Sequence, residues 1–164
     1  MIYIIDSGIL INQSVIPDLH IEDEVVYTTQ NVLNELKSSL SRSVLILFEE
    51  KYKITVINPS LINIDSVKKT ISKIGENKLS MQDIELLALA VELRNNDMVI
   101  IFTDDYAIMN IAHELEITVN NIKTTGGSQK RRYKFKCKSC GKYYNREQLD
   151  CEICGSQQFI RYKK

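Results

Sequence analysis

The sequence predicts an α/β protein in which a parallel sheet carries helices on both faces, followed by a small C-terminal ribbon held by four cysteines. Two observations predict this fold class. Over residues 1–122, segments with the pattern of buried strands alternate with segments of helical periodicity, as in parallel sheets. All four cysteines then lie after residue 136. At 164 residues and 44% hydrophobic composition, the chain can form one ordinary core and a small appendage.

The first half of the alternating region contains three expected strands and two expected helices. They are a strand over 1–5, a strand over 25–29, a helix from about residue 30, a helix over 42–52 and a strand over 54–58. In the helix from residue 30, apolar side chains recur at helical spacing on one face, namely Val32, Leu33, Leu36 and Leu40. Glu35 is expected in the early turns of this helix, and Asp6 directly follows the first strand.

The second half continues the alternation and ends on a short strand. The expected elements are a helix over 65–74, a helix over 80–94, a strand over 98–103, a helix over 105–115 and a strand over 117–119. Gly75 is a natural C-terminal stop for the first of these helices, because glycine adopts the left-handed conformation that ends many helices. The helix over 80–94 has the clearest periodicity of apolar residues.

Charge divides the chain into two parts although its formal net charge is zero. Residues 123–164 hold twelve lysines and arginines against three carboxylates, a net charge of +9, so residues 1–122 carry −9. A basic segment of this kind usually faces a polyanion, most often nucleic acid. We therefore expect three parts: an α/β domain over 1–122, a basic flexible linker over 123–132 and a ribbon over 133–164.

The cysteines occur as two Cys-x-x-Cys pairs, each followed by glycine: Cys137, Cys140, Cys151 and Cys154. Two such pairs predict a tetrahedral four-sulfur site for a structural Zn²⁺ ion. Two disulfides or a redox pair are the alternative, which the absence of a secretion signal disfavours. A segment of about 30 residues cannot build a stable core alone, so metal binding should supply its folding free energy.

Basic residues of the linker and of the first ribbon strand are the candidates for contact with nucleic acid: Lys130, Arg131, Arg132, Lys134 and Lys136. A solvated tether is the alternative for the linker residues. Six aromatic residues lie among the basic residues of the ribbon, and most should fill its small core. One or two of them are candidates for stacking on bases.

Carboxylates follow strand ends or lie near helix starts at four places in the first 122 residues: Asp6, Glu35, Asp83, and the adjacent Asp104 and Asp105. In parallel sheets such positions meet at one edge. Together these carboxylates predict an oxygen-rich pocket for Mg²⁺ or Mn²⁺. Asp83 has an alternative role, a capping box with Ser80 that needs no metal. Glu35 has one too, since a glutamate early in a helix is usually a solvent-facing charge.

The segments YIIDSGILI, NVLNELK, LSMQDIELLALA and FTDDYAIMN resemble the ordered motifs of PIN-domain nucleases over about residues 1–122. Followed by a basic linker and a four-cysteine ribbon, the chain resembles the archaeal-type Nin-one-binding endoribonucleases. This resemblance implies a Mn²⁺- or Mg²⁺-dependent endoribonuclease that cuts the small-subunit ribosomal RNA precursor at its 3′ end. It also implies that Asp6, Glu35, Asp83 and the 103–105 stretch hold the catalytic metal, with either Asp104 or Asp105 as direct ligand.

Further expectations concern partners and location. The resemblance implies a precursor of the small ribosomal subunit as partner, and no DNA is expected. The chain has neither a basic leader nor an uncharged apolar run of about 20 residues, so no membrane association and a cytoplasmic location are expected. Two alternatives stay open: a PIN-type toxin ribonuclease, and a zinc-ribbon assembly factor that binds RNA without catalysis.

Overall fold

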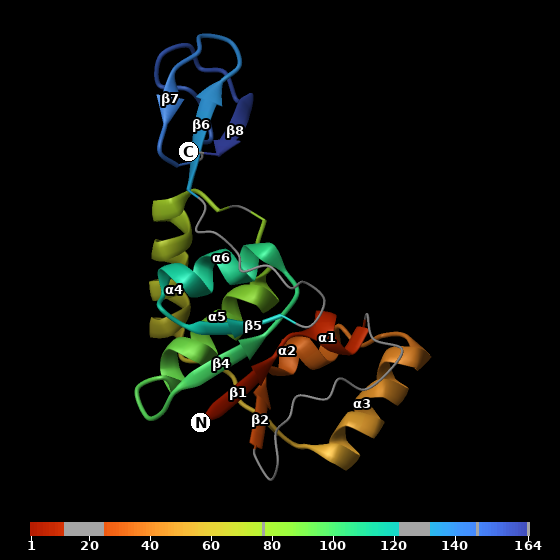
Figure 1. Ribbon diagram of the computed structural model, residues 1–164. Helices are drawn as coiled ribbons and strands as arrows, with labels where there is room; N and C mark the ends of the chain where they lie inside the picture. Colours follow the sequence, from red (N-terminus) through yellow and green to blue (C-terminus); the bar gives the residue numbers. More distant parts are fainter. Residues whose placement is uncertain (12–24, 77, 122–131, 147, 164) are drawn as a thin grey trace.

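The computed structural model describes residues 1–11, 25–76, 78–121, 132–146 and 148–163 (Figure 1). Its elements are, in order, β1 (Ile2–Ile5), α1 (Ser7–Ile11), β2 (Val25–Thr28), α2 (Gln30–Asn34), α3 (Ser39–Lys51), β3 (Lys53–Val56), α4 (Leu61–Ile74), α5 (Met81–Leu93), β4 (Val99–Phe102), α6 (Tyr106–Glu114), β5 (Thr118–Asn120), β6 (Tyr133–Cys137), β7 (Tyr143–Tyr144) and β8 (Phe159–Lys163).

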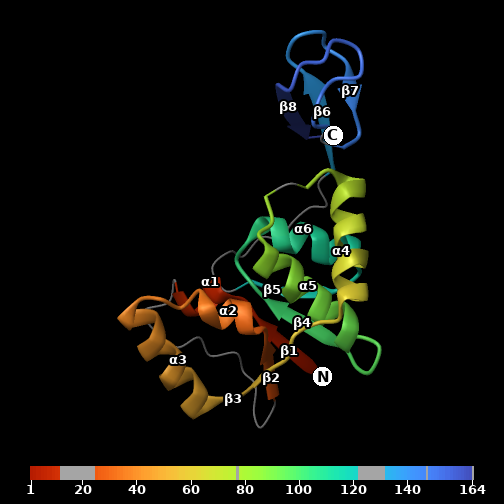
Figure 2. The ribbon, with the colours of Figure 1, turned by 180° about the vertical axis from the view of Figure 1, so that it is seen from behind.

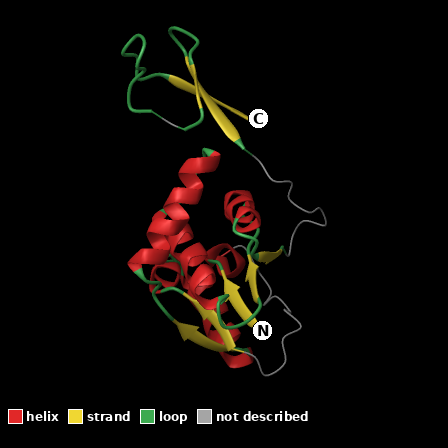
Figure 3. Cartoon of the chain, turned by 90° about the vertical axis from the view of Figure 1, so that its left-hand side faces the viewer, coloured by secondary structure: helices red, strands yellow, loops and turns green. Residues whose placement is uncertain are grey.

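The first five strands form one parallel sheet in the order β3-β2-β1-β4-β5. Successive side chains of a strand point to opposite faces, so each face receives its own core. Ile4 of β1 and Ile101 of β4 pack with α4, α5 and α6 on one face. Ile5 and Phe102 pack with α1 and α3 on the other. Figure 3 shows the helices packed around the strands of the sheet. The predicted parallel sheet with helices on both faces is therefore confirmed.

The helix expected from residue 30 through Leu40 is wrong in its length. Helix α2 ends at Asn34, Glu35 caps its C-terminus, and a new helix, α3, begins at Ser39. The side chain of Ser38 accepts a hydrogen bond from the Ser41 amide at 3.0 Å and so caps α3. The break lets Leu36 pack in the core below α1 and α3, while Leu40 is 63% exposed.

Other element ends differ by smaller amounts. Helix α4 begins at Leu61, four residues before the expected start, and the short helix α1 directly after β1 was not expected. Gly75 caps α4 in the left-handed conformation, with φ of 73°, as predicted. The described part of the chain contains no helix that is both long and apolar enough to cross a membrane.

The last three strands form a separate antiparallel sheet in the order β7-β6-β8, which we call the ribbon (residues 132–163 as described). It lies beyond the C-terminal end of α4 in both ribbon views (Figures 1 and 2). Phe135, Tyr144 and two cysteines form its small core. Most of the expected linker over 123–132, including Lys130 and Arg131, lies outside the described residues, so the domain boundaries stay a prediction.

Candidate active site and cysteine cluster

The carboxyl ends of β1 and β4 lie side by side, because Ile5 pairs with Phe102. This is the point in the strand order where a crevice forms in open parallel sheets. A cavity of about 290 Å³ is found there, lined by Asp6, Ser7, Gly8, Asp83, Asp104 and Asp105. Four of the five carboxylates that the sequence singled out therefore line one cavity.

Thr103 holds Asp6 in place. The Thr103 hydroxyl, fully buried, donates a hydrogen bond to Asp6 Oδ2 at 2.8 Å and accepts one from the Asp105 amide at 3.0 Å. The side chain of Asp6 is itself only 7% exposed. Thr103 thus connects the carboxylate that follows β1 to the end of β4, across the cavity.

Glu35, the fifth carboxylate, is connected to the cavity through Ser7. The Ser7 hydroxyl lies 2.5 Å from Glu35 Oε2 and 3.4 Å from Asp6 Oδ1, within hydrogen-bond reach of both. A position at the C-terminus of α2, instead of inside a longer helix, brings Glu35 to this place. Ser7 is not among the candidate residues that the sequence singled out. Its position next to Asp6, at the start of a helix, was the available signal for its bridging role.

Asp83 does form the capping box that competed with a metal-binding role. Its Oδ2 accepts the Ser80 amide at 2.7 Å, while the Ser80 hydroxyl accepts the Asp83 amide at 3.2 Å. The two roles are compatible, since the cap uses Oδ2 and the same side chain lines the cavity. The cap fixes the carboxylate at the start of α5.

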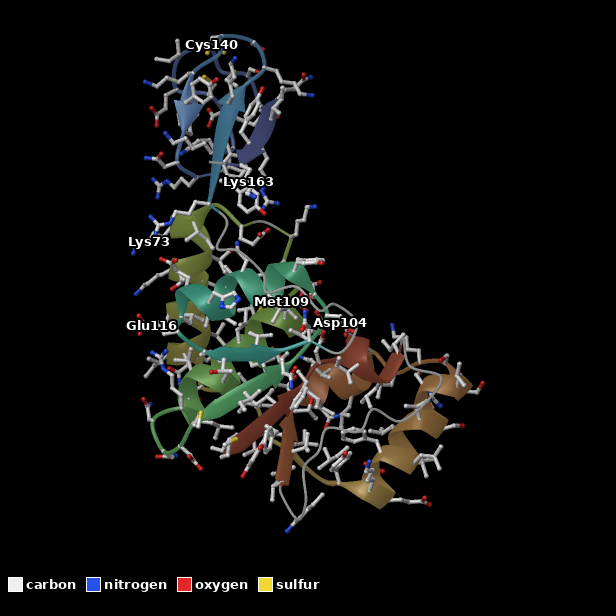
Figure 4. All side chains as sticks on the ribbon, in the orientation of Figure 1. Lys73, Asp104, Met109, Glu116, Cys140 and Lys163 are labelled. Carbon is white, nitrogen blue, oxygen red and sulfur yellow. The ribbon has the colours of Figure 1, made fainter. Side chains whose placement is uncertain are left out.

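The two adjacent aspartates have different surroundings. Asp105 is the N-cap of α6, and its Oδ1 accepts the amides of Ala107 at 2.6 Å and Ile108 at 3.4 Å. Asp104 is half-buried and Asp105 exposed, and both line the cavity. Asp105 therefore has a structural role besides any role in catalysis (Figure 4 labels Asp104 at this edge of the sheet).

Burial and crowding raise the pKa of two of these carboxyls. Burial is the larger cause of the raised pKa of Asp6, opposed by the hydrogen bond from Thr103, and the charges of Asp83 and Asp105 raise it further. Burial likewise raises the pKa of Asp83 against its bonds to Ser80, with added repulsion from Asp105 and Glu35. Burial is thus the main cause of both raised pKa values, and repulsion between the negative charges adds to it.

The side chains present suit a hard divalent cation. Carboxylate oxygens are the ligands that Mg²⁺ and Mn²⁺ prefer, and a cation would stabilise the charged forms that burial and mutual repulsion disfavour in Asp6 and Asp83. Because the caps use only Oδ2 of Asp83 and Oδ1 of Asp105, each keeps a second oxygen for a ligand role. The carboxylates surround the cavity but do not converge. Among the described residues, only the cysteines form a close metal-ligating cluster.

The four cysteine sulfurs meet at one end of the ribbon, all within 4.8 Å of one another. The Sγ atoms of Cys137 and Cys154 are 3.6 Å apart, and those of Cys140 and Cys151 are 3.4 Å apart. These distances far exceed a disulfide bond of about 2.05 Å. They approach the separation of about 3.8 Å expected between sulfurs around an ion with tetrahedral Zn–S bonds of about 2.3 Å. The cluster can therefore hold a metal ion.

Tyr144 supports this cluster from inside the ribbon. Its hydroxyl lies 3.2 Å from Cys151 Sγ and accepts the Glu152 amide at 3.1 Å. The hydrogen bond between them lowers the pKa of the Cys151 thiol to about 6 and raises the pKa of Tyr144 to about 12. At this distance the Tyr144 hydroxyl can donate to a Cys151 thiolate, the form in which cysteine binds metal ions.

The basic candidates occupy different environments. The guanidinium of Arg132 makes an ion pair with Glu114 of α6 at 3.2 Å. Lys134 and Lys136 lie on β6, opposite Tyr162 and Ile160 of β8, and Lys136 also lies opposite Tyr143 of β7. Directly paired residues share a face of the sheet.

That surface, which we call the lysine-tyrosine face, is formed by Lys134, Lys136, Tyr143, Ile160 and Tyr162. The rings of Tyr143 and Tyr162 have centroids 6.3 Å apart and are 55% and 42% exposed. The ammonium of Lys136 lies 5.3 Å from the centroid of the Tyr143 ring. Two basic groups and two exposed aromatic rings are thus gathered on one face of the ribbon.

Comparison with known proteins agrees with the fold. Residues 3–93 match the family described as the PIN domain of ribonuclease. The parallel sheet and the acidic cavity beyond its strand ends thus define a protein of the PIN-domain ribonuclease class.

The relatives narrow the class. Endoribonuclease Nob1 of Methanocaldococcus jannaschii is 36% identical over 141 residues, which cover 83% of this chain and 66% of that protein. The Nob1 endoribonucleases of Methanothermobacter thermautotrophicus and Pyrococcus abyssi are 35% and 33% identical, and the matches cover 80% and 79% of this chain and 78% and 80% of those proteins. The chain belongs to the Nob1 endoribonuclease family. It spans just under two thirds of the length of the Methanocaldococcus relative.

Proposed function

We propose that the protein is a Mn²⁺- or Mg²⁺-dependent endoribonuclease that cuts the small-subunit ribosomal RNA precursor at its 3′ end. The observation that carries the proposal is the cavity lined by Asp6, Asp83, Asp104 and Asp105, with Glu35 attached through Ser7. Carboxylates that repel one another at a strand-end crevice are arranged for a cation and not for bare phosphate. The family membership supports the reaction class, and the ribosomal substrate comes from the same relationship.

The roles of the side chains follow from their contacts. Asp6, Asp83 and one of Asp104 and Asp105 would hold the cation. When bound, the ion supplies a site for the scissile phosphate, lowers the pKa of an attacking water and stabilises charge at phosphorus. Glu35, oriented by the Ser7 hydroxyl, is placed to accept a proton from that water or to complete the ligand set. The expected products carry a 5′-phosphate and a 3′-hydroxyl.

The ribbon would bind the RNA outside the cavity. We propose that the four cysteines hold a structural Zn²⁺ ion, which the convergence of the four sulfurs and their distances support. Lys134 and Lys136 are placed to contact phosphates, and Tyr143 and Tyr162 offer two exposed rings for stacking on unpaired bases. We propose the partner to be a precursor of the small ribosomal subunit in the cytoplasm.

The test is cleavage of an RNA that spans the 3′ end of small-subunit ribosomal RNA, with Mn²⁺ or with EDTA. The Asp6→Asn variant should lose cleavage and keep its RNA affinity, because it removes a cation ligand without touching the ribbon. Asp65→Asn, at an exposed position on α4, is the matched control and should cut like the wild type. Equal cleavage by wild type and Asp6→Asn would refute the proposed site. Salt-sensitive RNA binding without any cleavage would indicate an assembly factor.

A further inference from the structure

The ribbon contacts the C-terminal end of α4 through five residues from two distant parts of the chain. Gly75 and Glu76 follow α4, and Tyr133, Phe135 and Arg161 come from β6 and β8. We call this contact the joint. We infer that the joint holds the ribbon in one orientation on the α/β fold, so that the lysine-tyrosine face and the acidic cavity bind one RNA as a single rigid surface. The inference rests on the proposed function.

A buried ion pair forms the centre of the joint. The guanidinium of Arg161 donates to Glu76 Oε1 at 2.6 Å, and the two side chains are only 16% and 2% exposed. The same carboxylate oxygen accepts the Lys78 amide at 3.2 Å. A carboxylate this deeply buried needs a partner, and Arg161 of the ribbon supplies one. An ion pair shielded from water has a defined geometry, unlike most exposed pairs.

The guanidinium of Arg161 is also held from its flat side. Its central carbon lies 3.5 Å from the centroid of the Tyr133 ring, a stacking distance for arginine on an aromatic ring. Glu76 thus holds the guanidinium of Arg161 by a hydrogen bond, and Tyr133 holds it by stacking on its flat face. Since Tyr133 and Arg161 lie on neighbouring ribbon strands, this arrangement sets the angle of the ribbon sheet relative to Glu76.

Gly75 brings the backbone of α4 against β6. A Cβ atom at this position would lie 2.9 Å from the carbonyl oxygen of Tyr133 and 3.2 Å from the ring of Phe135. Contacts this short leave no room for a side chain. The glycine therefore serves the joint in addition to ending the helix, and the fit between α4 and the ribbon is close over both backbone and side chains.

The joint and the lysine-tyrosine face lie on opposite sides of the ribbon sheet. Arg161 is paired with Phe135, whereas Lys134 is paired with Tyr162, and successive residues of a strand face opposite sides. A joint that fixes one side of the ribbon sheet therefore also sets the direction in which the lysine-tyrosine face points. Figure 4 shows Lys73, in the last turn of α4, near the base of the ribbon, and Cys140 at its far end. Glu76 and Arg161 are accordingly positioning residues: they touch no reacting group and act by orienting the RNA-binding face.

Measurements of rotational diffusion test whether the joint holds the ribbon in one orientation on the α/β fold. In ¹⁵N relaxation measurements, amides of β6 and β8 should report the same rotational correlation time as amides of β1 and β4. Glu76→Lys places an ammonium group against the Arg161 guanidinium and should give the ribbon a shorter correlation time, with zinc content and the chemical shifts of the parallel sheet retained. Independent tumbling of the ribbon in the wild type, or common tumbling in Glu76→Lys, would overturn the inference.

Two controls separate the joint from side effects. Glu49→Lys makes the same charge change at an exposed position on α3 and should tumble as the wild type does. Gly75→Ala perturbs the joint without a charge change and should release the ribbon. Gly155→Ala carries a similar left-handed strain, with φ of 67°, but its Cβ would meet nothing within 4 Å, so it should leave the ribbon docked. Adding Arg161→Glu to Glu76→Lys restores opposite charges and should restore common tumbling.

RNA binding with Mn²⁺ present, measured on an RNA analogue that cannot be cleaved, tests the functional consequence without depending on catalysis. For an RNA long enough to reach both the ribbon and the cavity, Glu76→Lys should weaken binding about tenfold, because a loose ribbon lowers the effective concentration of the second contact. A short RNA that occupies only the ribbon should bind within about twofold of the wild type. Glu49→Lys should not weaken either complex, since both variants add the same positive charge. Equal affinities of Glu76→Lys and Glu49→Lys for the long RNA would overturn the positioning role.

Cleavage adds a readout that separates the two proposals. If the protein cuts RNA, Glu76→Lys should raise KM for the long RNA. It should leave kcat unchanged for a different, short substrate that occupies only the cavity. If neither wild type nor variant cuts, the proposed reaction fails, while tumbling and affinity still decide whether the joint orients the ribbon.

Discussion

Removing the Ser7 hydroxyl should reduce catalysis without changing the fold. Ser7 is 7% exposed, and its hydroxyl lies 2.5 Å from Glu35 Oε2 and 3.4 Å from Asp6 Oδ1. A hydrogen bond to a charged group contributes about 1.5–3 kcal/mol. If this energy orients Glu35 in the transition state, Ser7→Ala should lower kcat/KM by about 10- to 150-fold, since about 1.4 kcal/mol corresponds to a factor of ten.

The assay is cleavage of the ribosomal RNA fragment over a range of Mn²⁺ concentrations, with RNA affinity measured separately on an analogue that cannot be cleaved. The affinity should stay at the wild-type value, because Ser7 lies far from the ribbon in sequence and lines the cavity. Ser43→Ala is the matched control, since it also removes one serine hydroxyl, one that donates to the Ser39 carbonyl at an exposed site. Cleavage by Ser7→Ala within twofold of the wild type at every Mn²⁺ concentration would refute the positioning of Glu35 by Ser7.

Three further predictions concern stability. Without added Mn²⁺, Asp6 and Asp83 should contribute a fall in the free energy of unfolding as the pH rises from about 3.8 through their raised pKa values, because the folded state holds protons there that the unfolded state has lost. Added Mn²⁺ should remove this contribution, so identical pH profiles of urea unfolding with and without Mn²⁺ would contradict the prediction. Cys151→Ser should abolish stoichiometric zinc and the dispersed amide signals of the ribbon while the parallel sheet stays folded, and a folded, zinc-free ribbon would count against the metal site. Phe48→Ala should lower the free energy of unfolding in urea by about 3–5 kcal/mol, since Phe48 is fully buried against Tyr52 with ring centroids 4.7 Å apart. A decrease below about 1 kcal/mol would show that the core closes over the space left by the deleted ring.

Sequence patterns were sufficient wherever the determining contacts are local. The strand ending at Asp6, the capping box of Ser80 and Asp83, and the left-handed Gly75 each depend on residues within a few positions of one another. Alternation of strands and helices then requires a parallel sheet, and a parallel sheet brings its strand ends to one edge. The cavity lined by Asp6, Asp83 and the paired aspartates follows from those two steps.

The pattern failed where long-range packing competes with helical periodicity. Residues 30–40 have apolar spacing that suits one helix, but Ser38 starts a new helix and Leu36 packs in the core with α1 and α3. The break also changes the position of Glu35, which reaches Ser7 only from the end of α2. Periodicity records which side chains share a face and carries no information about where a helix must end to meet a distant segment.

The sequence by itself determined the fold class, the candidate carboxylates and the four clustered cysteines, because spacing along the chain sets each of them. Only the tertiary structure decided that Ser7 meets Glu35 across 28 positions and that Arg161 meets Glu76 across 85. Such contacts depend on the path of the whole chain. An arginine on a ribbon strand and a glutamate after a helix have no local feature that pairs them, and they come together because the ribbon packs on the end of α4.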